Sequence, residues 1–462
     1  MKYYLSIDIG ASSGRHILSS VQNGKLVLEE VYRFENGMTQ KDGHLVWEYE
    51  KLFSNIIEGL KECKKLGKIP VSVGIDTWGV DYALIDADGK VIGDVYAYRD
   101  GRTEEPIKKV HEIIPFETLY KRTGSQFQIY NTIYQLYTDK LSGKLDKAER
   151  FLMMPDFFNY LLTGVMKNEF TNASTTGLMS AKTRDWDMET VKELDLPEKL
   201  FKELSDPATF VGNLKPEIAK EIGYDIKVVL PATHDTASAV MAVPEIDQPL
   251  YISSGTWSLL GIESPVAIST EEALKENFTN EGGYERSTRF LKNIMGLWMI
   301  QCVRREYNKK YSWGDFVTLS KEVKDFDSIV DVNDNSFLAP ASMIEAIKDY
   351  CRKTGQKVPE TPGEIALCVY ASLAVCYKRA VETVERVTGY KFDTIHIVGG
   401  GCQNAYLNEL TAKRTGRRVV AGPVEATAIG NALSQLLYDG AVKNINEAKE
   451  LVKVSFDTET IG

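Results

Sequence analysis

The sequence has no paired-cysteine motif, no long apolar run and no excess of basic residues. Its six cysteines are scattered and no Cys-x-x-Cys pair occurs, so a structural zinc site is not expected. No apolar run approaches the roughly 18 residues that a membrane-spanning helix needs. The formal net charge is −10, which argues against a nucleic-acid-binding protein, because such proteins carry a basic patch or stripe.

Two further absences concern location and phosphate binding. The N-terminal segment MKYYLSIDIGASSG is interrupted by Asp8 and has no signal-peptide cleavage pattern, so we interpret it as a strand and expect a cytoplasmic protein. No Gly-Lys-Ser/Thr sequence follows the first glycine-containing turn, which excludes a P-loop. In a reducing compartment buried free thiols are expected; a bridge between Cys351 and Cys368 stays open but would be unusual there.

The length and an internal repetition predict two domains. A chain of 462 residues is too long for one ordinary core. A proline-containing joint lies at residues 244–249. Directly after it, residues 250–262 repeat the strand, Ser-rich turn and strand of residues 3–18. We therefore expect a duplicated α/β architecture with domains at residues 1–245 and 246–462.

The segment KVVLPATHDTASAV (residues 227–240) carries the strongest local signal for chemistry. Its short apolar run predicts a buried strand that ends at Pro231, and the small residues after Asp235 begin a helix. Open α/β sheets place reactive groups at such strand ends. The positive end of the helix favours an ionised Asp235, which could accept a proton from a substrate hydroxyl. The alternative is that Asp235 only caps the helix.

The first strand is followed by a turn with the features of a phosphate site. Gly10 and Gly14 permit backbone angles that other residues resist. Ser12 and Ser13 place hydroxyl groups beside exposed backbone N–H groups, and a turn of this kind can cradle phosphate oxygens. Asp8 precedes the turn and could hold Mg²⁺ through water. The alternative is an ordinary hairpin with a Gly-Ser turn.

Three other segments add polar or glycine-rich turns. Residues 71–85 form a strand, a polar elbow and a strand; an exposed Trp78 beside Gly79 suits stacking on a sugar, unless the indole packs into a core. Residues 168–176 are polar and turn-like and could border a pocket. Residues 394–404 deliver three glycines onto a helix N-terminus, where a charged ligand can approach the backbone. This glycine-rich turn and the Ser-rich turns within residues 3–18 and 250–262 each follow a predicted strand, and together they favour nucleotide binding.

This combination resembles the FGGY carbohydrate kinase family, whose two domains share the actin-like (ribonuclease H-like) ATPase fold. The segments that carry the resemblance are DIGASSGR (8–15), GIDTWGVDYALID (74–86), AYRDGRT (97–103), MPDFFNYLLTG (154–164), HDTASAV (234–240), YISSGTWSL (251–259), LKNIMGLW (291–298) and VGGGCQN (398–404). The resemblance implies an α/β protein with two actin-like domains flanking a deep catalytic cleft. It also implies transfer of the ATP γ-phosphoryl group to a sugar hydroxyl with Mg²⁺.

The resemblance also assigns roles to individual residues. Asp235 matches the catalytic base. Positions that contact the nucleotide match Ala11, Ser12, Ser13, Gly14, Arg15, Thr256, Gln301 and Gly400. Positions that contact the sugar match Gly79, His234, Asp235, Thr236 and Asn293, to which the elbow adds Trp78. We expect a sugar and ATP as partners, no nucleic acid or membrane, and a monomer or homodimer.

Two other classes of function stay open. An ATP-driven conformational protein, such as an actin-type filament or chaperone, would need neither an alcohol-activating base nor a polar sugar elbow. A sugar-binding regulator would be expected to carry a DNA-binding helical module before the kinase-like half. ATP turnover that depends on a sugar separates a kinase from both classes.

Overall fold

The computed structural model describes all residues 1–462, which form two compact units. The first unit contains Met1–Ile246, Glu263–Phe290 and Ala426–Ser455, and the second contains Asp247–Ile262, Leu291–Glu425 and Phe456–Gly462. The boundary predicted near residue 245 lies next to Ile246, the residue after which the chain first passes from the first unit into the second. The prediction that residues 246–462 form one continuous domain differs from this division, because two later segments pack with the first unit.

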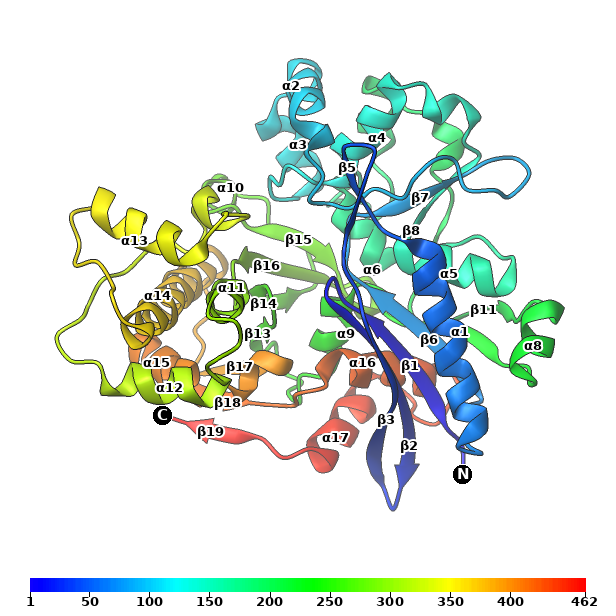
Figure 1. Cartoon of the computed structure of the whole chain (residues 1–462). Helices are drawn as coiled ribbons and strands as arrows, with labels where there is room; N and C mark the ends of the chain where they lie inside the picture. The colour runs from blue at the N-terminus through cyan, green and yellow to red at the C-terminus, as the bar shows by residue number, and fades with distance from the viewer. The chain divides into compact units, whose positions relative to one another are not determined.

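The first unit is built on a six-stranded sheet with the order β11-β12-β6-β1-β2-β3 (Figure 1). Its strands are β1 (Tyr4–Ile9), β2 (Ser13–Gln22), β3 (Lys25–Glu35), β6 (Ser72–Thr77), β11 (Thr209–Asn213) and β12 (Lys227–Leu230). Strands β12, β6 and β1 are parallel, and β2 returns antiparallel to β1. Every residue of β1 and β6 is buried, as their position in the middle of the sheet requires.

The first unit also contains helices and short strands outside this sheet. The helices are α1 (Tyr49–Lys65), α2 (Glu104–Ile113), α3 (Phe116–Thr123), α4 (Thr132–Leu141), α5 (Met154–Thr163), α6 (Phe170–Ala173), α7 (Met188–Glu193), α8 (Pro216–Ile222), α9 (Asp235–Met241), α10 (Glu271–Lys275), α16 (Ala426–Tyr438) and α17 (Ile445–Ser455). The short strands are β4 (Thr39–Lys41), β5 (His44–Val46), β7 (Tyr82–Ile85), β8 (Arg150–Met153), β9 (Asn168–Glu169) and β10 (Leu204–Ser205). The sequence pattern predicts one helical region over residues 116–162, but β8 interrupts it because residues 150–153 pair with β7.

Helix α16 explains why a late segment belongs to the first unit. Asn431 donates from Nδ2 to the Gly74 carbonyl of β6 at 3.0 Å, and Gln435 donates from Nε2 to the Leu5 carbonyl of β1 at 2.9 Å. Both side chains are fully buried. Because a buried amide without a partner is costly, these bonds fix the helix against the two central strands. Figure 1 shows α16 beside β1 and α9.

The second sheet has seven strands in the order β15-β16-β14-β13-β17-β18-β19. They are β13 (Leu250–Ser254), β14 (Ser258–Ser264), β15 (Thr279–Gly282), β16 (Thr288–Ile294), β17 (Thr394–Val398), β18 (Arg418–Ala421) and β19 (Glu459–Ile461). As in the first sheet, a hairpin (β13 and β14) is followed by strands parallel to its first member (β17 and β18). This repetition matches the predicted duplication. Strand β15, the last two residues of β14 and the first three residues of β16 belong to the first unit.

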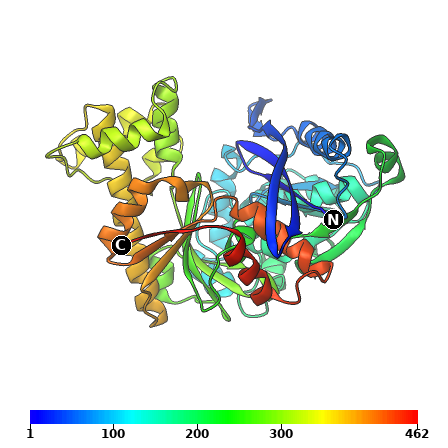
Figure 2. The same ribbon diagram turned by 90° about the horizontal axis from the view of Figure 1, so that it is seen from below.

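The helices of the second unit lie after β16 in the chain. They are α11 (Trp298–Glu306), α12 (Trp313–Glu322), α13 (Met343–Lys353), α14 (Pro362–Thr388) and α15 (Ala405–Thr415). The long helix α14 begins with a capping box between Thr361 and Glu364 and ends at Gly389, which adopts the left-handed conformation. In Figure 2 the yellow-green and yellow helices of this unit lie on one side of its strands.

Two further features of the chain concern membrane-spanning helices and the state of the cysteines. No helix of the chain combines the length and the apolar content that a bilayer crossing requires. All six cysteines are free, so the Cys351–Cys368 bridge is not formed. Cys63, Cys351, Cys368 and Cys402 are buried as predicted, whereas Cys302 and Cys376 are partly exposed.

Candidate active site

Asp235 stands at the junction of a buried strand and a helix, as predicted. After β12 the chain stays extended, and Thr77 of β6 donates its backbone N–H to the Thr233 carbonyl at 2.9 Å. His234 is the N-cap residue of α9, and Asp235 is the first residue of that helix. Asp235 Oδ1 accepts from the backbone N–H of Thr236 at 2.6 Å. Oδ2 makes no hydrogen bond to the protein, so helix capping alone does not account for this carboxylate.

The surroundings of Asp235 keep the carboxylate basic. The side chain is 28% exposed. Burial raises the pKa of Asp235 to about 6, Asp8 adds to the rise, and His234 opposes it. A carboxylate with a pKa near neutrality is a better proton acceptor than an ordinary one and is still ionised at pH 7. The arrangement therefore fits a general base.

Asp8 and Asp76 are two further carboxylates of the first unit, and they form a pair. They are aligned partners on the parallel strands β1 and β6, so their side chains leave the sheet on the same face. Asp8 Oδ2 accepts from Arg15 Nη2 at 2.6 Å. Asp76 is fully buried; Oδ2 accepts from Asn431 Nδ2 at 2.6 Å, whereas Oδ1 has no hydrogen-bond partner. Burial and then Asp8 raise the pKa of Asp76. One or two carboxylates are the usual protein share of a Mg²⁺ site, so Asp8 fits its predicted role.

The turn between β1 and β2 has the compact form that the sequence predicts. The backbone N–H of Gly10 donates to the Ser13 carbonyl at 2.9 Å, and Asn36 Nδ2 donates to the Gly10 carbonyl at 2.8 Å. Gly14 has no substitute, because a Cβ there would lie 2.1 Å from the Phe34 ring. Ala11, Ser12 and Ser13 stay partly or fully exposed. The turn can therefore offer backbone N–H groups to an anion.

The prediction of an exposed Trp78 is wrong, because only 7% of the residue is exposed. Its ring lies 4.2 Å from that of Trp47, centroid to centroid. Asp81 Oδ2 accepts from both indoles, at 2.9 Å from Trp78 and 2.7 Å from Trp47, and from the Tyr98 backbone N–H at 3.0 Å. The core-packed alternative is the observed arrangement, since a partner distant in sequence covers the ring. A contact of Trp78 with a sugar stays a prediction.

The backbone after Trp78 is constrained on both sides. A Cβ at Gly79 would lie 2.8 Å from the Thr175 side chain, which explains the glycine. Val80 has φ 69°, a left-handed conformation that is costly for a β-branched residue. Thr175 Oγ1 accepts from the Val80 N–H at 2.9 Å, and Thr132 Oγ1 donates to the Val80 carbonyl at 2.7 Å. Strain that neighbours hold in place is typical of functional sites.

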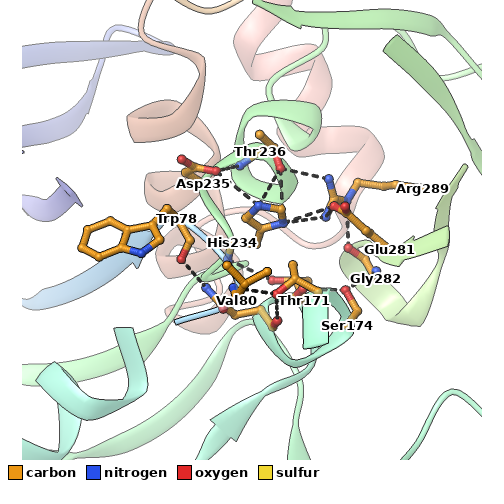
Figure 3. Close-up of polar contacts among 12 residues, drawn as sticks. Trp78, Val80, Thr171, Ser174, His234, Asp235, Thr236, Glu281, Gly282 and Arg289 are labelled. Atoms are coloured by element: carbon orange, nitrogen blue, oxygen red, sulfur yellow. Dashed lines mark hydrogen bonds and ion pairs between the residues drawn. The ribbon is translucent and has the colours of Figure 1, made fainter. Parts of the chain in front are cut away.

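His234 belongs to a buried polar cluster that the sequence analysis missed (Figure 3). Arg289 Nη2 lies 3.1 Å from His234 Nδ1 and 3.0 Å from Glu281 Oε2. Arg289 also donates from Nη1 to Thr236 Oγ1 at 3.1 Å and from Nε to the Gly282 carbonyl at 2.8 Å. The other ring nitrogen, His234 Nε2, lies 3.5 Å from Asp235 Oδ1. The predicted sugar-contacting residues His234, Asp235 and Thr236 are thus adjacent in space.

Glu169 is a second residue that the sequence analysis missed. The side chain is fully buried and accepts from the backbone N–H and the hydroxyl of both Thr171 and Thr233, and from the Asn172 N–H. Thr233 immediately precedes His234, so Glu169 fixes the segment that presents the site. The predicted polar turn at residues 168–176 contains Glu169, but its partner 64 residues away gave no local signal.

The remaining predicted residues lie in the second unit. Thr256 is in the turn between β13 and β14, and its carbonyl accepts from the Trp298 N–H at 3.1 Å. This contact joins the turn to the start of α11, the helix that carries Gln301. A Cβ at Gly401 would lie 2.1 Å from Ser254 Oγ, so the turn containing Gly400 lies against the end of β13. Asn293 lies on β16, close to its end.

Two family models match the chain. The model for the N-terminal domain of the FGGY family of carbohydrate kinases matches residues 3–242, and the model for the C-terminal domain matches residues 250–437. A rhamnulokinase of Halalkalibacterium halodurans is 49% identical over 461 residues, which cover 99% of this chain and 98% of the relative. A rhamnulokinase of Bacillus subtilis is 43% identical over 457 residues, with coverages of 98% and 94%.

Solved structures share the fold at low sequence identity. A ligand-bound xylulose kinase from Lactobacillus acidophilus has a TM-score of 0.79 at 15% identity and covers 100% of this chain and 93% of its own. A glycerol kinase from Plasmodium falciparum, solved with ADP, has a TM-score of 0.78 at 16% identity, with coverages of 99% and 94%. These likenesses confirm the predicted fold class, a two-domain α/β sugar kinase fold.

Proposed function

The chain belongs to the FGGY family of carbohydrate kinases, and from this we propose that it phosphorylates the 1-hydroxyl of L-rhamnulose with ATP. The products are L-rhamnulose 1-phosphate and ADP, and the reaction serves L-rhamnose breakdown in the cytoplasm. Support for this sugar comes from the relatives called rhamnulokinase, which are 41% to 49% identical along nearly their whole length. Support for the chemistry comes from Asp235, a basic carboxylate with one uncommitted oxygen.

The reaction needs a base because a primary alcohol is a poor nucleophile at neutral pH. Asp235 takes the proton of the 1-hydroxyl while the sugar oxygen bonds to the γ-phosphorus. The bond from that phosphorus to the bridging oxygen breaks, and ADP leaves. His234, Thr236, Gly79, Trp78 and Asn293 contact the sugar in this proposal. Most of the rate enhancement comes from positioning and from stabilising phosphate charge.

The nucleotide part of the proposal uses both units. In the first, the turn from Ala11 through Ser12, Ser13 and Gly14 to Arg15 contacts the phosphates with its backbone N–H groups and the Arg15 guanidinium. In the second, Thr256, Gln301 and Gly400 contact the nucleotide. Mg²⁺, when bound, would offset the negative charge of the phosphates, and Asp8 is the residue that would hold it through water. Glycines and partly exposed backbone in these turns support the assignment.

The raised pKa of Asp235 gives an expected pH dependence. The base works only when ionised, so with a pKa of about 6 the value of kcat/KM for the sugar should fall about tenfold per pH unit below pH 6. The ¹³Cγ NMR signal of Asp235 reports the same titration directly, and its absence in Asp235→Asn identifies it. Titration near the ordinary aspartate pKa, about 4, would contradict the basic carboxylate.

The sugar is tested by ADP release with Mg-ATP against a panel of L-rhamnulose, L-fuculose, L-ribulose, D-xylulose and glycerol. We expect kcat/KM for L-rhamnulose to exceed that for every other compound by at least about tenfold, equivalent to roughly 1.4 kcal/mol. ATP turnover without sugar is the baseline. A preference for a different ketose or polyol would support kinase activity but assign another substrate to the enzyme. Turnover that no sugar stimulates would instead favour an ATP-driven conformational protein.

A further inference from the structure

Arg289 is a charged group beside the site, and none of its side chain is exposed. It is the second residue of β16, and Glu281 lies on β15, the neighbouring strand of the sheet. A guanidinium that loses water must find acceptors for its five N–H groups, because it has no lone pair to offer. Four of these N–H groups have acceptors in the cluster described above.

The distribution of these four bonds determines which nitrogen of His234 carries the proton. Nη2 of Arg289 has two hydrogens and two neighbours, Glu281 Oε2 at 3.0 Å and His234 Nδ1 at 3.1 Å. Both hydrogens are used when Nδ1 accepts one of them. A proton on Nδ1 would leave one buried N–H of Arg289 without an acceptor, because arginine can only donate. The imidazole therefore carries its hydrogen on Nε2.

Glu281 is the charged group that favours the opposite arrangement. Its Oε2 lies 3.3 Å from His234 Nδ1 and could accept a proton held there. The same oxygen already accepts from Arg289, and the second hydrogen of Arg289 Nη2 needs Nδ1 as its acceptor. The pairing of Arg289 with Glu281 thus leaves Nδ1 of His234 as an acceptor.

We propose that Arg289, braced by Glu281, is a positioning residue that holds His234 as the Nε2–H tautomer and aims this N–H at the substrate beside Asp235. Nε2 lies 3.5 Å from Asp235 Oδ1 and 3.2 Å from Thr236 Oγ1. Thr236 Oγ1 accepts from Arg289, so its own hydroxyl hydrogen stays available as a donor. His234 and Thr236 then both donate to sugar oxygens, and Asp235 is left as the only base. This inference rests on the proposed sugar phosphorylation.

The tautomer is measured directly by ¹⁵N NMR of protein labelled at histidine, with His234→Asn to assign the signal among the five histidines. In the wild type we expect a protonated Nε2 and an unprotonated Nδ1 at neutral pH. Arg289→Lys keeps the charge but loses the planar fork. Because a lone lysine can destabilise the buried cluster, the double variant Arg289→Met with Glu281→Gln removes both charges together. Arg33→Lys, at an exposed ion pair, is the matched control.

We expect both cluster variants to give mixed tautomers at His234 and a sugar KM about tenfold higher, as for the loss of one well-placed hydrogen bond. The ATP KM should stay within about twofold, since the hydrogen bonds of Arg289 go to His234, Thr236, Glu281 and Gly282, none of which is a predicted nucleotide residue. A wild-type His234 protonated on Nδ1 or on both nitrogens would overturn the proposal. So would folded variants with an unchanged tautomer and an unchanged sugar KM. The NMR result stands even if the enzyme prefers another sugar, so the two proposals fail separately.

Discussion

Replacing Asp235 by asparagine is expected to lower turnover about 10²- to 10⁴-fold, the usual contribution of a general base. The amide keeps the shape of the carboxylate, and its oxygen can still accept from the Thr236 N–H, as Oδ1 does now at 2.6 Å. It has no basicity, so the sugar hydroxyl keeps its proton as the bond to phosphorus forms. Steady-state kinetics with sugar and Mg-ATP measure the loss, and calorimetry measures sugar and nucleotide affinity.

Affinity separates a lost base from a lost site. Sugar and ATP should bind Asp235→Asn within a few-fold of the wild type, because the contacts around Asp235 stay in place. Asp195→Asn is the matched control, since that side chain is 91% exposed and should leave kinetics unchanged. A variant with turnover within a few-fold of the wild type would remove Asp235 as the base. Loss of sugar binding would assign Asp235 to substrate positioning instead.

The parts of the fold that the sequence predicts are those in which local pattern and final environment agree. The buried run at β12 and the small residues after Asp235 form a strand and a helix start, because the sheet needs apolar residues on both faces there. The Ser-rich hairpins at the head of each half also form as predicted. The catalytic candidate was therefore found from residues that are neighbours in the chain.

The parts that the sequence did not predict depend on distant partners. Arg289 meets His234 across 55 residues, and no local pattern distinguishes it from a surface arginine. The sequence around Trp78 does not predict its burial, because the residue that covers its ring, Trp47, lies in another segment of the chain. The same limit explains the domain division, because α16 joins the first unit through buried amides about 355 residues away in sequence. The spacing of apolar residues indicates which face of a helix or strand is buried. It does not indicate which distant residue forms a hydrogen bond with a buried polar atom.

Removing the Glu169 side chain is expected to have the largest effect on stability. Glu169→Ala leaves the buried N–H groups of Thr171, Asn172 and Thr233 without an acceptor. Each unsatisfied buried donor costs about 1 to 3 kcal/mol, so we expect the free energy of unfolding to fall by at least about 3 kcal/mol. Urea unfolding followed by circular dichroism measures this, with exposed Glu203→Ala as the control.

The loss should also reach the chemistry, because Glu169 acts on the site through Thr233 and Thr171. Thr171 Oγ1 accepts from the His234 backbone N–H at 3.2 Å, and Glu169 in turn accepts from the Thr171 hydroxyl. We therefore expect sugar KM to rise in Glu169→Gln even where the protein is still folded. The side-chain amide of glutamine keeps the volume of the carboxylate. Its NH₂ group, however, faces N–H and O–H donors that need an acceptor. If Glu169→Ala unfolds like the wild type, Glu169 does not hold this segment. If stability falls while sugar KM is unchanged, its role is confined to the core.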